Sequence, residues 1–404
     1  MRVTRRILLA GLPLAGCVNA SAARWTTLHV APDGDGDGSS WQAAAPLRDL
    51  DDLVRRIDPG GQILIAADRG EYEIGEGLDI SAGGAPGQPV RVRGVNSATE
   101  APMPAVLRGV RSEAEQGAEA FRLWRGASHL YFSHLDFRAI GNGCFRVGAP
   151  LSNLTVEDCA FDDVYRFLEN TAGEGYGHAS MRDFVLRRCS GVRAERGFLR
   201  IRYASRHGLI EDCAAQGKAN EGGYIPVGCA VDDRAGDIVY RRCVMEGFQQ
   251  WRDAGDYWNG DGFSDEEQNF GIRYEACVGR GSTDGGFDCK SRDVVLVNCI
   301  AEDNKRNFRI WSKHATLTGC ISRNPNFRGR GEESADSCHI WVGVEEDARV
   351  LISDLTVVDS DATPILEFEH DVGRVEIRGF TIDSPRVNWG YDAERVRSGM
   401  LHAS

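Results

Sequence analysis

The sequence predicts an all-β fold: a right-handed parallel β-helix, a single-stranded solenoid of about eleven coils behind a short N-terminal capping helix. Three observations predict it. A short strand pattern that mostly ends in cysteine recurs about every 21 to 35 residues, and a second strand pattern recurs about halfway between its copies. These segments show no helical period. Forty-eight glycines against thirteen prolines indicate many tight turns.

Composition limits the classes of partner. The chain has 404 residues, of which 42% are hydrophobic and 26% charged, as is usual for a folded protein. Its net charge of −13 argues against nucleic acid or an anionic membrane surface as a partner. Arginine is the usual cation, because only four of the 47 basic residues are lysines. These are Lys218, Lys290, Lys305 and Lys313.

Residues 1–17 are expected to form a signal peptide with a lipobox. Three arginines precede an apolar run, residues 7–15, that is too short to span a bilayer as a helix. The sequence Leu14-Ala-Gly-Cys17 makes Cys17 the expected lipidation site, and the preceding Arg5-Arg6 pair resembles a twin-arginine export signal. We expect a periplasmic or outer-membrane lipoprotein that touches the membrane only through this N-terminal lipid anchor. A cleaved signal with a chance cysteine is the alternative.

Residues 18–75 are expected to form a tether and an N-terminal cap. Apolar residues recur there at helical spacing between two prolines, which predicts a short amphipathic helix that covers the first coil. They are Leu47, Leu50, Leu53, Val54 and Ile57. The acidic segment 33–41 could bind calcium, but it lacks the distal glutamate of an EF-hand loop, so a capping turn is favoured.

Residues 76–385 are expected to form the β-helix, and residues 386–404 a C-terminal tail. The repeat is clear in Leu154-Thr-Val156-Glu-Asp-Cys159 and Phe184-Val-Leu186-Arg-Arg-Cys189. Coils of a solenoid stack at about 4.8 Å, so equivalent cysteines should form an internal column of free thiols that act as small apolar fillers. The column is Cys159, Cys189, Cys213, Cys243, Cys277, Cys299 and Cys320.

The second strand of several coils carries polar and aromatic residues on one face. If Phe287 and Cys289 point inward, Asp288 and Lys290 point outward by alternation. The neighbouring coils should add further residues to this outer face. They are Asp261, Arg309, Trp311, His339 and Trp341.

Three consecutive coils resemble the ninth family of polysaccharide lyases. The resemblance rests on Asn259-Gly-Asp261-Gly-Phe263, on Asp284-Gly-Gly-Phe287-Asp288 and on Arg306-Asn-Phe308-Arg309-Ile310. It implies a right-handed β-helix that cleaves pectate-like polyuronates by β-elimination, with Asp261, Asp284 and Asp288 as calcium ligands. Arg309 would stand where the family has its catalytic lysine. The chain departs from the family at Gly285, where the family has another aspartate.

β-Elimination explains these residue types. It removes the proton α to a uronate carboxylate, whose charge must be neutralised by Ca²⁺ or by a cationic side chain. A cationic side chain acts as the base only if its pKa is depressed, and arginine rarely loses a proton. Lys290 is therefore a second candidate for the base beside Arg309. A plain salt bridge between Asp288 and Arg309 is the structural alternative.

A long coil between Cys243 and Cys277 should form a loop on the binding face. It carries aromatic and acidic residues that suit sugar rings and hydroxyl groups. The expected substrate-binding residues are Trp251, Trp258, Trp311, His339 and Trp341.

The favoured function is a polysaccharide lyase that acts on an acidic, uronate-containing glycan, as a monomer. Two alternatives stay open. One is a glycoside hydrolase on the same fold, although Asp232-Asp233 is not followed by the G-H-G and R-x-K motifs of polygalacturonase-like enzymes. The other is a non-catalytic glycan-binding or structural β-helix lipoprotein, since a fold does not establish a function.

Overall fold

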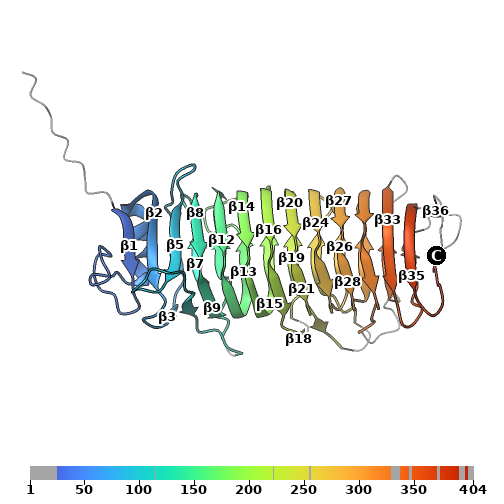
Figure 1. Ribbon diagram of the computed structural model, residues 1–404, viewed down its shortest axis with the longest axis horizontal. Coiled ribbons are helices and arrows are strands. Elements are labelled where there is room, and N and C mark those ends of the chain that lie inside the picture. The colour runs from blue at the N-terminus through green and yellow to red at the C-terminus, as the bar shows by residue number, and fades with distance from the viewer. Residues whose placement is uncertain are drawn as a thin grey trace, which may run out of the picture.

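The computed structural model describes residues 25–113, 115–221, 223–253, 256–328, 337–344, 348–370, 374–390 and 396–398. These residues wind into one long parallel sheet of 34 strands, which confirms the predicted parallel β-helix (Figure 1). Cys17 and the expected signal segment lie outside the described residues. Within the described part of the chain, no helix is long and apolar enough to cross a membrane.

A short helical cap covers the first coil, as the apolar spacing predicted. A 3-10 turn, η1 (Leu47–Asp49), leads into α1 (Leu50–Arg56), and its apolar residues are buried against the first strands. The acidic loop before it forms a turn stabilised by its own backbone. Gly34, Gly36 and Gly38 donate backbone N–H groups to carbonyls of Ala31, Ala44 and Ala43.

The strands of successive coils form three rows, which we call A, B and C. Every pairing between neighbouring strands within a row is parallel. Row A contains β1 (Trp25–Val30), β2 (Ile57–Ala66), β5 (Val90–Val95), β8 (Leu130–Ser133), β11 (Leu151–Ser152), β12 (Leu154–Glu157), β14 (Met181–Arg187), β16 (Arg206–Glu211), β20 (Gly236–Arg241), β24 (Phe270–Glu275), β27 (Asp293–Val297), β30 (His314–Thr318), β33 (Arg349–Val358), β35 (Val375–Asp383) and β36 (Val396–Ser398). Parallel pairing thus begins before the expected boundary at residue 76 and continues past residue 385.

Row B follows the cysteine of each coil. It contains β3 (Tyr72–Glu73), β6 (Ala105–Arg108), β9 (Leu135–Ile140), β13 (Ala160–Asn170), β15 (Ser190–Ile201), β17 (Ala214–Gly217), β21 (Val244–Glu246), β25 (Val278–Arg280), β28 (Ile300–Glu302) and β31 (Ile321–Arg323). The long strands β13 and β15 continue from row B into row C, and β33 and β35 continue from row A into row B.

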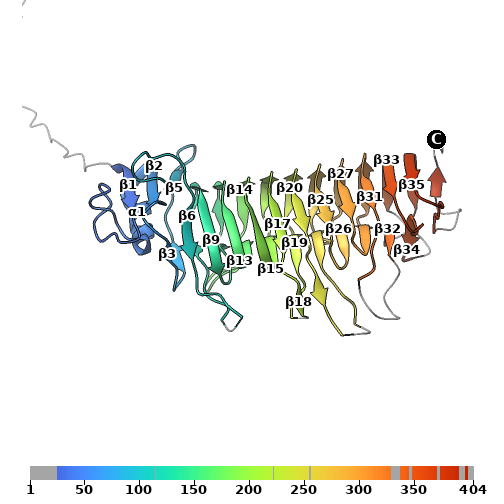
Figure 2. The same ribbon diagram turned by 60° about the horizontal axis from the view of Figure 1, so that its bottom comes forward.

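Row C holds the polar and aromatic face predicted from the sequence. It contains β4 (Leu78–Ile80), β7 (Phe121–Leu123), β10 (Phe145–Val147), the ends of β13 and β15, β19 (Val227–Val231), β23 (Asp261–Asp265), β26 (Gly285–Cys289), β29 (Arg306–Ile310), β32 (Cys338–Val342) and β34 (Leu366–Phe368). Two insertions between rows B and C, each with one short strand, pair as β18 (Asn220–Glu221) and β22 (Gln250–Trp251). They project from the wall of the solenoid near its middle (Figure 2).

The turn from row A to row B explains the recurring cysteine. The residue before each column cysteine has a positive φ, between 51° and 64°, which turns the chain and points the cysteine inward. These residues are Asp158, Arg188, Asp212, Arg242, Ala276, Asn298 and Gly319.

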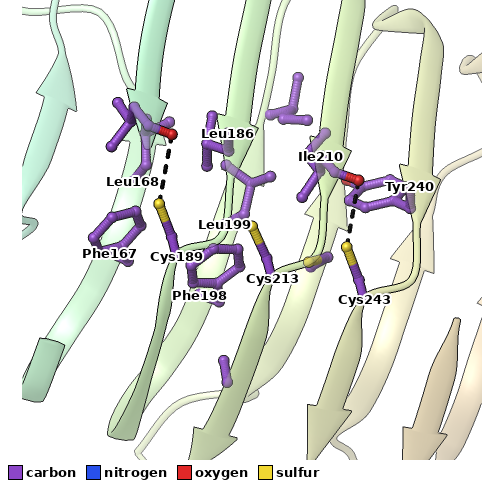
Figure 3. Close-up of a cluster of buried hydrophobic side chains, with 14 of the residues drawn as sticks. Phe167, Leu168, Leu186, Cys189, Phe198, Leu199, Ile210, Cys213, Tyr240 and Cys243 are labelled. Carbon is purple, nitrogen blue, oxygen red and sulfur yellow. Dashed lines mark hydrogen bonds between the residues drawn. The ribbon is translucent and has the colours of Figure 1, made fainter. Parts of the chain in front are cut away.

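The predicted column of thiols is confirmed. All eleven described cysteines are buried and none forms a disulfide. Figure 3 shows Cys189, Cys213 and Cys243 in successive coils. Cys189 and Cys243 each direct Sγ at a carbonyl of the preceding coil, Val156 at 3.5 Å and Ile210 at 3.3 Å. The thiols therefore fill the corner between rows A and B as apolar groups with weak hydrogen bonds.

A stack of phenylalanines aligns row C inside the solenoid. The rings of Phe263, Phe287 and Phe308 are fully buried, and their centroids are 4.9 and 5.4 Å apart. This stack is the inner counterpart of the polar outer face. It sets which outer residues of neighbouring coils lie side by side.

Candidate functional site

Four strands of row C, β23, β26, β29 and β32, place the candidate site on the outer face. The register pairs Asp288 with Arg309, as stacking of the coils predicted, and it also pairs Arg309 with Trp341. Carboxylates of one coil therefore lie directly beside cations of the next coil.

Charged groups of these strands form one connected network, which we call the ion cluster. Arg309 Nη1 contacts Asp284 Oδ2 at 2.9 Å and Asp288 Oδ2 at 3.4 Å. Lys290 Nζ lies 2.8 Å from the same Asp288 oxygen and 3.0 Å from Glu266 Oε1. The members of the cluster are Asp261, Glu266, Asp284, Asp288, Lys290, Arg306 and Arg309.

Arg306 closes the network on its other side. Its Nη1 atom lies 3.4 Å from Asp284 Oδ1 and donates a hydrogen bond of 2.9 Å to the hydroxyl of Tyr257. Asp261 accepts a 2.7 Å hydrogen bond from the backbone N–H of Gly285. The predicted salt bridge between Asp288 and Arg309 is thus one part of a larger arrangement.

Two cations and one carboxylate of the cluster, Arg309, Lys290 and Glu266, reach solvent, and the aspartates and Arg306 lie behind them. The side chains of Arg309 and Lys290 are 16% and 23% exposed, whereas those of Asp284 and Asp288 are at most 2% exposed. A ligand that approaches this face therefore meets Arg309 and Lys290 together with the carboxylate of Glu266, whose side chain is 44% exposed.

The pKa values separate the roles of these groups. Burial lowers the pKa of Arg309 and of Lys290, but neighbouring carboxylates, above all Asp288, outweigh it and leave both pKa values above their ordinary range. Both groups stay charged and do not accept a proton in this arrangement. Burial and the neighbouring Asp288 raise the pKa of Asp261 well above its usual value, and burial also raises that of Glu266.

Lys305 was not among the sequence candidates, although it belongs to the group of lysines noted above. Its Nζ atom lies 4.3 Å from the ring centroid of Tyr257 and 5.3 Å from that of Phe327. Burial, followed by the charge of Arg306, lowers the pKa of Lys305 to about 8. Two features of the sequence could have indicated Lys305: lysine is scarce in this chain, and Lys305 directly precedes the motif that begins at Arg306.

Aromatic side chains flank the cluster. The guanidinium of Arg309 lies over Trp311 at 5.2 Å, and that of Arg306 lies over Trp341 at 4.1 Å. The indole N–H groups of Trp311 and Trp341 are buried without a hydrogen-bond partner among the described residues. The two tryptophans thus lie beside the guanidinium groups of Arg306 and Arg309.

The inserted loop places its two tryptophans differently. The ring centroids of Trp251 and Trp258 are 5.0 Å apart, with Trp258 buried and Trp251 46% exposed. Trp258 therefore supports the loop, and Trp251 is the ring that solvent and a ligand can reach.

His339 does not lie on the outer face, contrary to the alternation pattern. It is completely buried, with Nδ1 at 2.8 Å from Ser322 Oγ and Nε2 at 3.6 Å from Asp359 Oδ2. Residues three apart in a regular strand point to opposite faces, yet Arg306 and Arg309 both reach Asp284. Simple alternation therefore fails at the start of these strands. His339 consequently turns toward β31 and takes a supporting position.

The carboxylates do not fit the calcium site that the resemblance implies. Both oxygens of Asp284 and one of Asp288 already contact side-chain cations. At Gly285 a Cβ atom would lie only 2.8 Å from Asp261 Oδ1, so a side chain at the position of the missing ligand would require Asp261 to shift. Among the described residues, no group of three or more His, Cys, Asp or Glu side chains is arranged to hold a metal ion.

A hollow of about 810 Å³ adjoins the cluster at the corner between rows C and A. It includes Glu266, which bonds to Lys290, and it extends over earlier coils to Asp233 and Arg202. The outward arginines of these coils are paired, Arg200 with Asp232 at 2.5 Å and Arg202 with Asp233 at 3.7 Å. The hollow gives an extended chain room to continue from the cluster along the solenoid.

Comparisons with known proteins support the fold. No family model and no curated protein matches the chain. Among solved structures, the pectate lyase Pel9A is similar with a TM-score of 0.57 and 17% identity, over 78% of this chain and 80% of that protein. The catalytic domain of a GH87 alpha-1,3-glucanase in complex with tetrasaccharides is similar with a TM-score of 0.59 and 10% identity, over 97% of this chain and 70% of that one. At these identities the likeness concerns the fold, which enzymes with different reactions on polysaccharides share.

Proposed function

We propose that the protein is a polysaccharide lyase that cleaves a uronate-containing glycan by β-elimination at the ion cluster. The observation that carries the proposal is the arrangement of charge: Arg309 and Lys290 are partly exposed, Arg309 lies beside Trp311 and Trp341, and the counter-ions Asp284 and Asp288 are buried behind them. Cations pair with a uronate carboxylate, and aromatic faces pack on sugar rings.

The charge balance favours an anionic ligand. Three cations of the cluster, Lys290, Arg306 and Arg309, are paired with Glu266, Asp284 and Asp288, and burial raises the pKa of Asp261 and so disfavours a further negative charge there. The adjoining Lys305 then adds a positive charge below pH 8 or so, because its pKa is about 8. One carboxylate from a substrate would compensate that surplus charge.

Arg309 and Lys290 act electrostatically in this proposal. Their raised pKa values keep both protonated, so they bind the uronate carboxylate and stabilise the negative charge that develops on it as the α proton leaves. Arg309 and Lys290, the two residues that the sequence suggested as the base, therefore neutralise charge in this proposal. The proton acceptor has to be a different side chain.

Lys305 is the proposed base. Its lowered pKa makes its neutral form common at mildly alkaline pH, which general base catalysis requires. The base takes the proton on the carbon next to the carboxylate, a carbon–carbon double bond forms, and the glycosidic C–O bond breaks toward the leaving sugar, whose oxygen is then protonated. Tyr257 covers Lys305, so a bound sugar must displace that ring for the step to occur.

Glycoside hydrolysis is the second candidate, and Asp261 favours it. A carboxyl whose pKa is raised by burial, beside a second carboxyl group, is the kind of pair that a hydrolase uses as acid and base. Asp261 is buried behind the cations, however, which places it further from a ligand than Arg309. The lyase therefore accounts for more of the arrangement.

The test is a screen of the mature protein on polyuronates, with product followed in two ways. A lyase forms unsaturated ends, seen by ultraviolet absorbance, together with new reducing ends. A hydrolase forms reducing ends only, and a binding protein forms neither. Arg309→Ala should abolish product formation, and Arg242→Ala is the matched control, because Arg242 pairs with Asp212 at a distant corner. Full activity of Arg309→Ala would refute the proposal.

The location of the protein is a proposal of its own. A lipoprotein held at Cys17 outside the cytoplasm would meet a glycan that is too large to enter the cell.

A further inference from the structure

We infer that the guanidinium of Arg309 occupies the position of a metal ion between Asp284 and Asp288, so that the ion cluster is complete without calcium. The inference concerns the ions that the resting protein holds. It does not rest on the proposed lyase activity.

The first step is the bridging contact. A single nitrogen, Arg309 Nη1, lies 2.9 Å from Asp284 Oδ2 and 3.4 Å from Asp288 Oδ2. A cation shared by two carboxylates is what a bound metal ion would provide at the same place. Arg309 comes from the next coil, so the solenoid itself brings this cation to the carboxylates.

The second step concerns the remaining oxygens. Arg306 contacts the other oxygen of Asp284 at 3.4 Å, and Lys290 contacts Asp288 at 2.8 Å. Asp288 Oδ1 is the one oxygen of the three aspartates that is buried without a hydrogen-bond partner among the described residues. Calcium takes about six to eight oxygen ligands, so a single unpaired buried oxygen is too few to form a calcium site.

The third step is the close approach permitted by Gly285. A Cβ atom there would lie 2.8 Å from Asp261 Oδ1 and 3.3 Å from Asp288 Cβ. The side chains of Asp261 and Asp288 therefore fill the space in which a fourth ligand would stand. An added carboxylate would clash unless Asp261 moved.

Burial of Asp284 makes its pairing with a cation energetically important. The side chain of Asp284 is fully buried, and a buried carboxylate without a counter-ion is strongly unfavourable. Calcium could bind only by displacing Arg309, which the fold holds next to its partners at a high effective concentration. Removal of the tethered cations should consequently uncover a weak calcium site.

The experiment is calorimetric titration of CaCl₂ into the metal-free mature protein. The measured quantity is the saturable binding of calcium that is present with Asp288 and absent after Asp288→Asn, which we call Asp288-dependent binding. The informative variant is Arg309→Met with Lys290→Met, which deletes two cations and keeps the carboxylates. Its matched control is Arg242→Met with Arg378→Met, which changes the net charge equally at two separate surface pairs, with Asp212 and with Glu376.

We expect no Asp288-dependent calcium binding in the wild type or in the control. In the double variant we expect one site with a dissociation constant on the order of 10⁻⁴ to 10⁻³ M, lost when Asp288→Asn is added. Asp288-dependent binding in the wild type would overturn the inference, and this comparison holds even if the double variant does not fold. A folded double variant that binds no calcium would also overturn it.

Discussion

Replacement of Phe287 by alanine tests whether the aromatic stack supports the candidate site. The ring is fully buried, stacks on Phe263 and Phe308 at 4.9 and 5.4 Å, and meets Tyr274 edge-on at 5.5 Å. Loss of a buried phenylalanine side chain costs about 3–5 kcal/mol. Three aromatic pairs, each worth about 0.5–1.5 kcal/mol, place Phe287→Ala near the upper end of that range.

The assay is equilibrium unfolding of the mature chain in guanidinium chloride, followed by tryptophan fluorescence. Phe270→Ala is the matched control, because it makes the same deletion at a half-buried ring on the outer face. The guanidinium groups of Arg206 and Arg292 cover that ring at 4.5 and 4.8 Å. Such contacts are worth about 0.5–1 kcal/mol each at exposed sites, so the control should lose about 1–2 kcal/mol. If Phe287→Ala lost no more free energy of unfolding than Phe270→Ala, the stack would not support row C.

Three further predictions can be tested separately. Burial lowers the pKa of His339 from 6.5 to about 4, so between these pH values only the unfolded chain binds a proton at this residue. The free energy of unfolding should therefore be highest above pH 6.5 and fall by about 3 kcal/mol toward pH 4. His339→Gln should remove most of this pH dependence when unfolding is measured at both pH values. If Lys305 is the base, the rate of cleavage should rise with pH through about 8, and Lys305→Arg, which stays protonated, should lose activity; an unchanged pH–rate profile in that variant would exclude Lys305. Cys17→Ser should move the protein from the membrane to the soluble fraction on cell fractionation, and a variant that stays membrane-bound would refute the lipid anchor.

The repeat was predictable because it depends on local sequence. Column cysteines such as Cys159 and Cys189 mark equal positions in successive coils, and strand alternation assigned the inner face of β26 and the pairing of Asp288 with Arg309 correctly. The cap helix followed from apolar spacing between two prolines in the same way. These features need only near neighbours in the chain and the regular stacking of coils.

Placement within the site was less predictable. The alternation pattern places His339 on the outer face, but its side chain is buried, because these strands do not alternate regularly at their start. Lys305 carries no motif of its own, and its lowered pKa results from burial beside Arg306. Both effects depend on neighbours that the insertions and bends of several coils bring together.

The sequence by itself therefore determined the solenoid, its rows of stacked residues and the strands that carry the candidate site. Only the tertiary structure decided which of these side chains are charged, which face solvent and which neutralise one another. The physical reason is that stacking order follows from periodicity along the chain. Ionisation and exposure instead depend on burial and on distances of about 3 Å between groups from different coils, such as Arg309 and Asp284 at 2.9 Å.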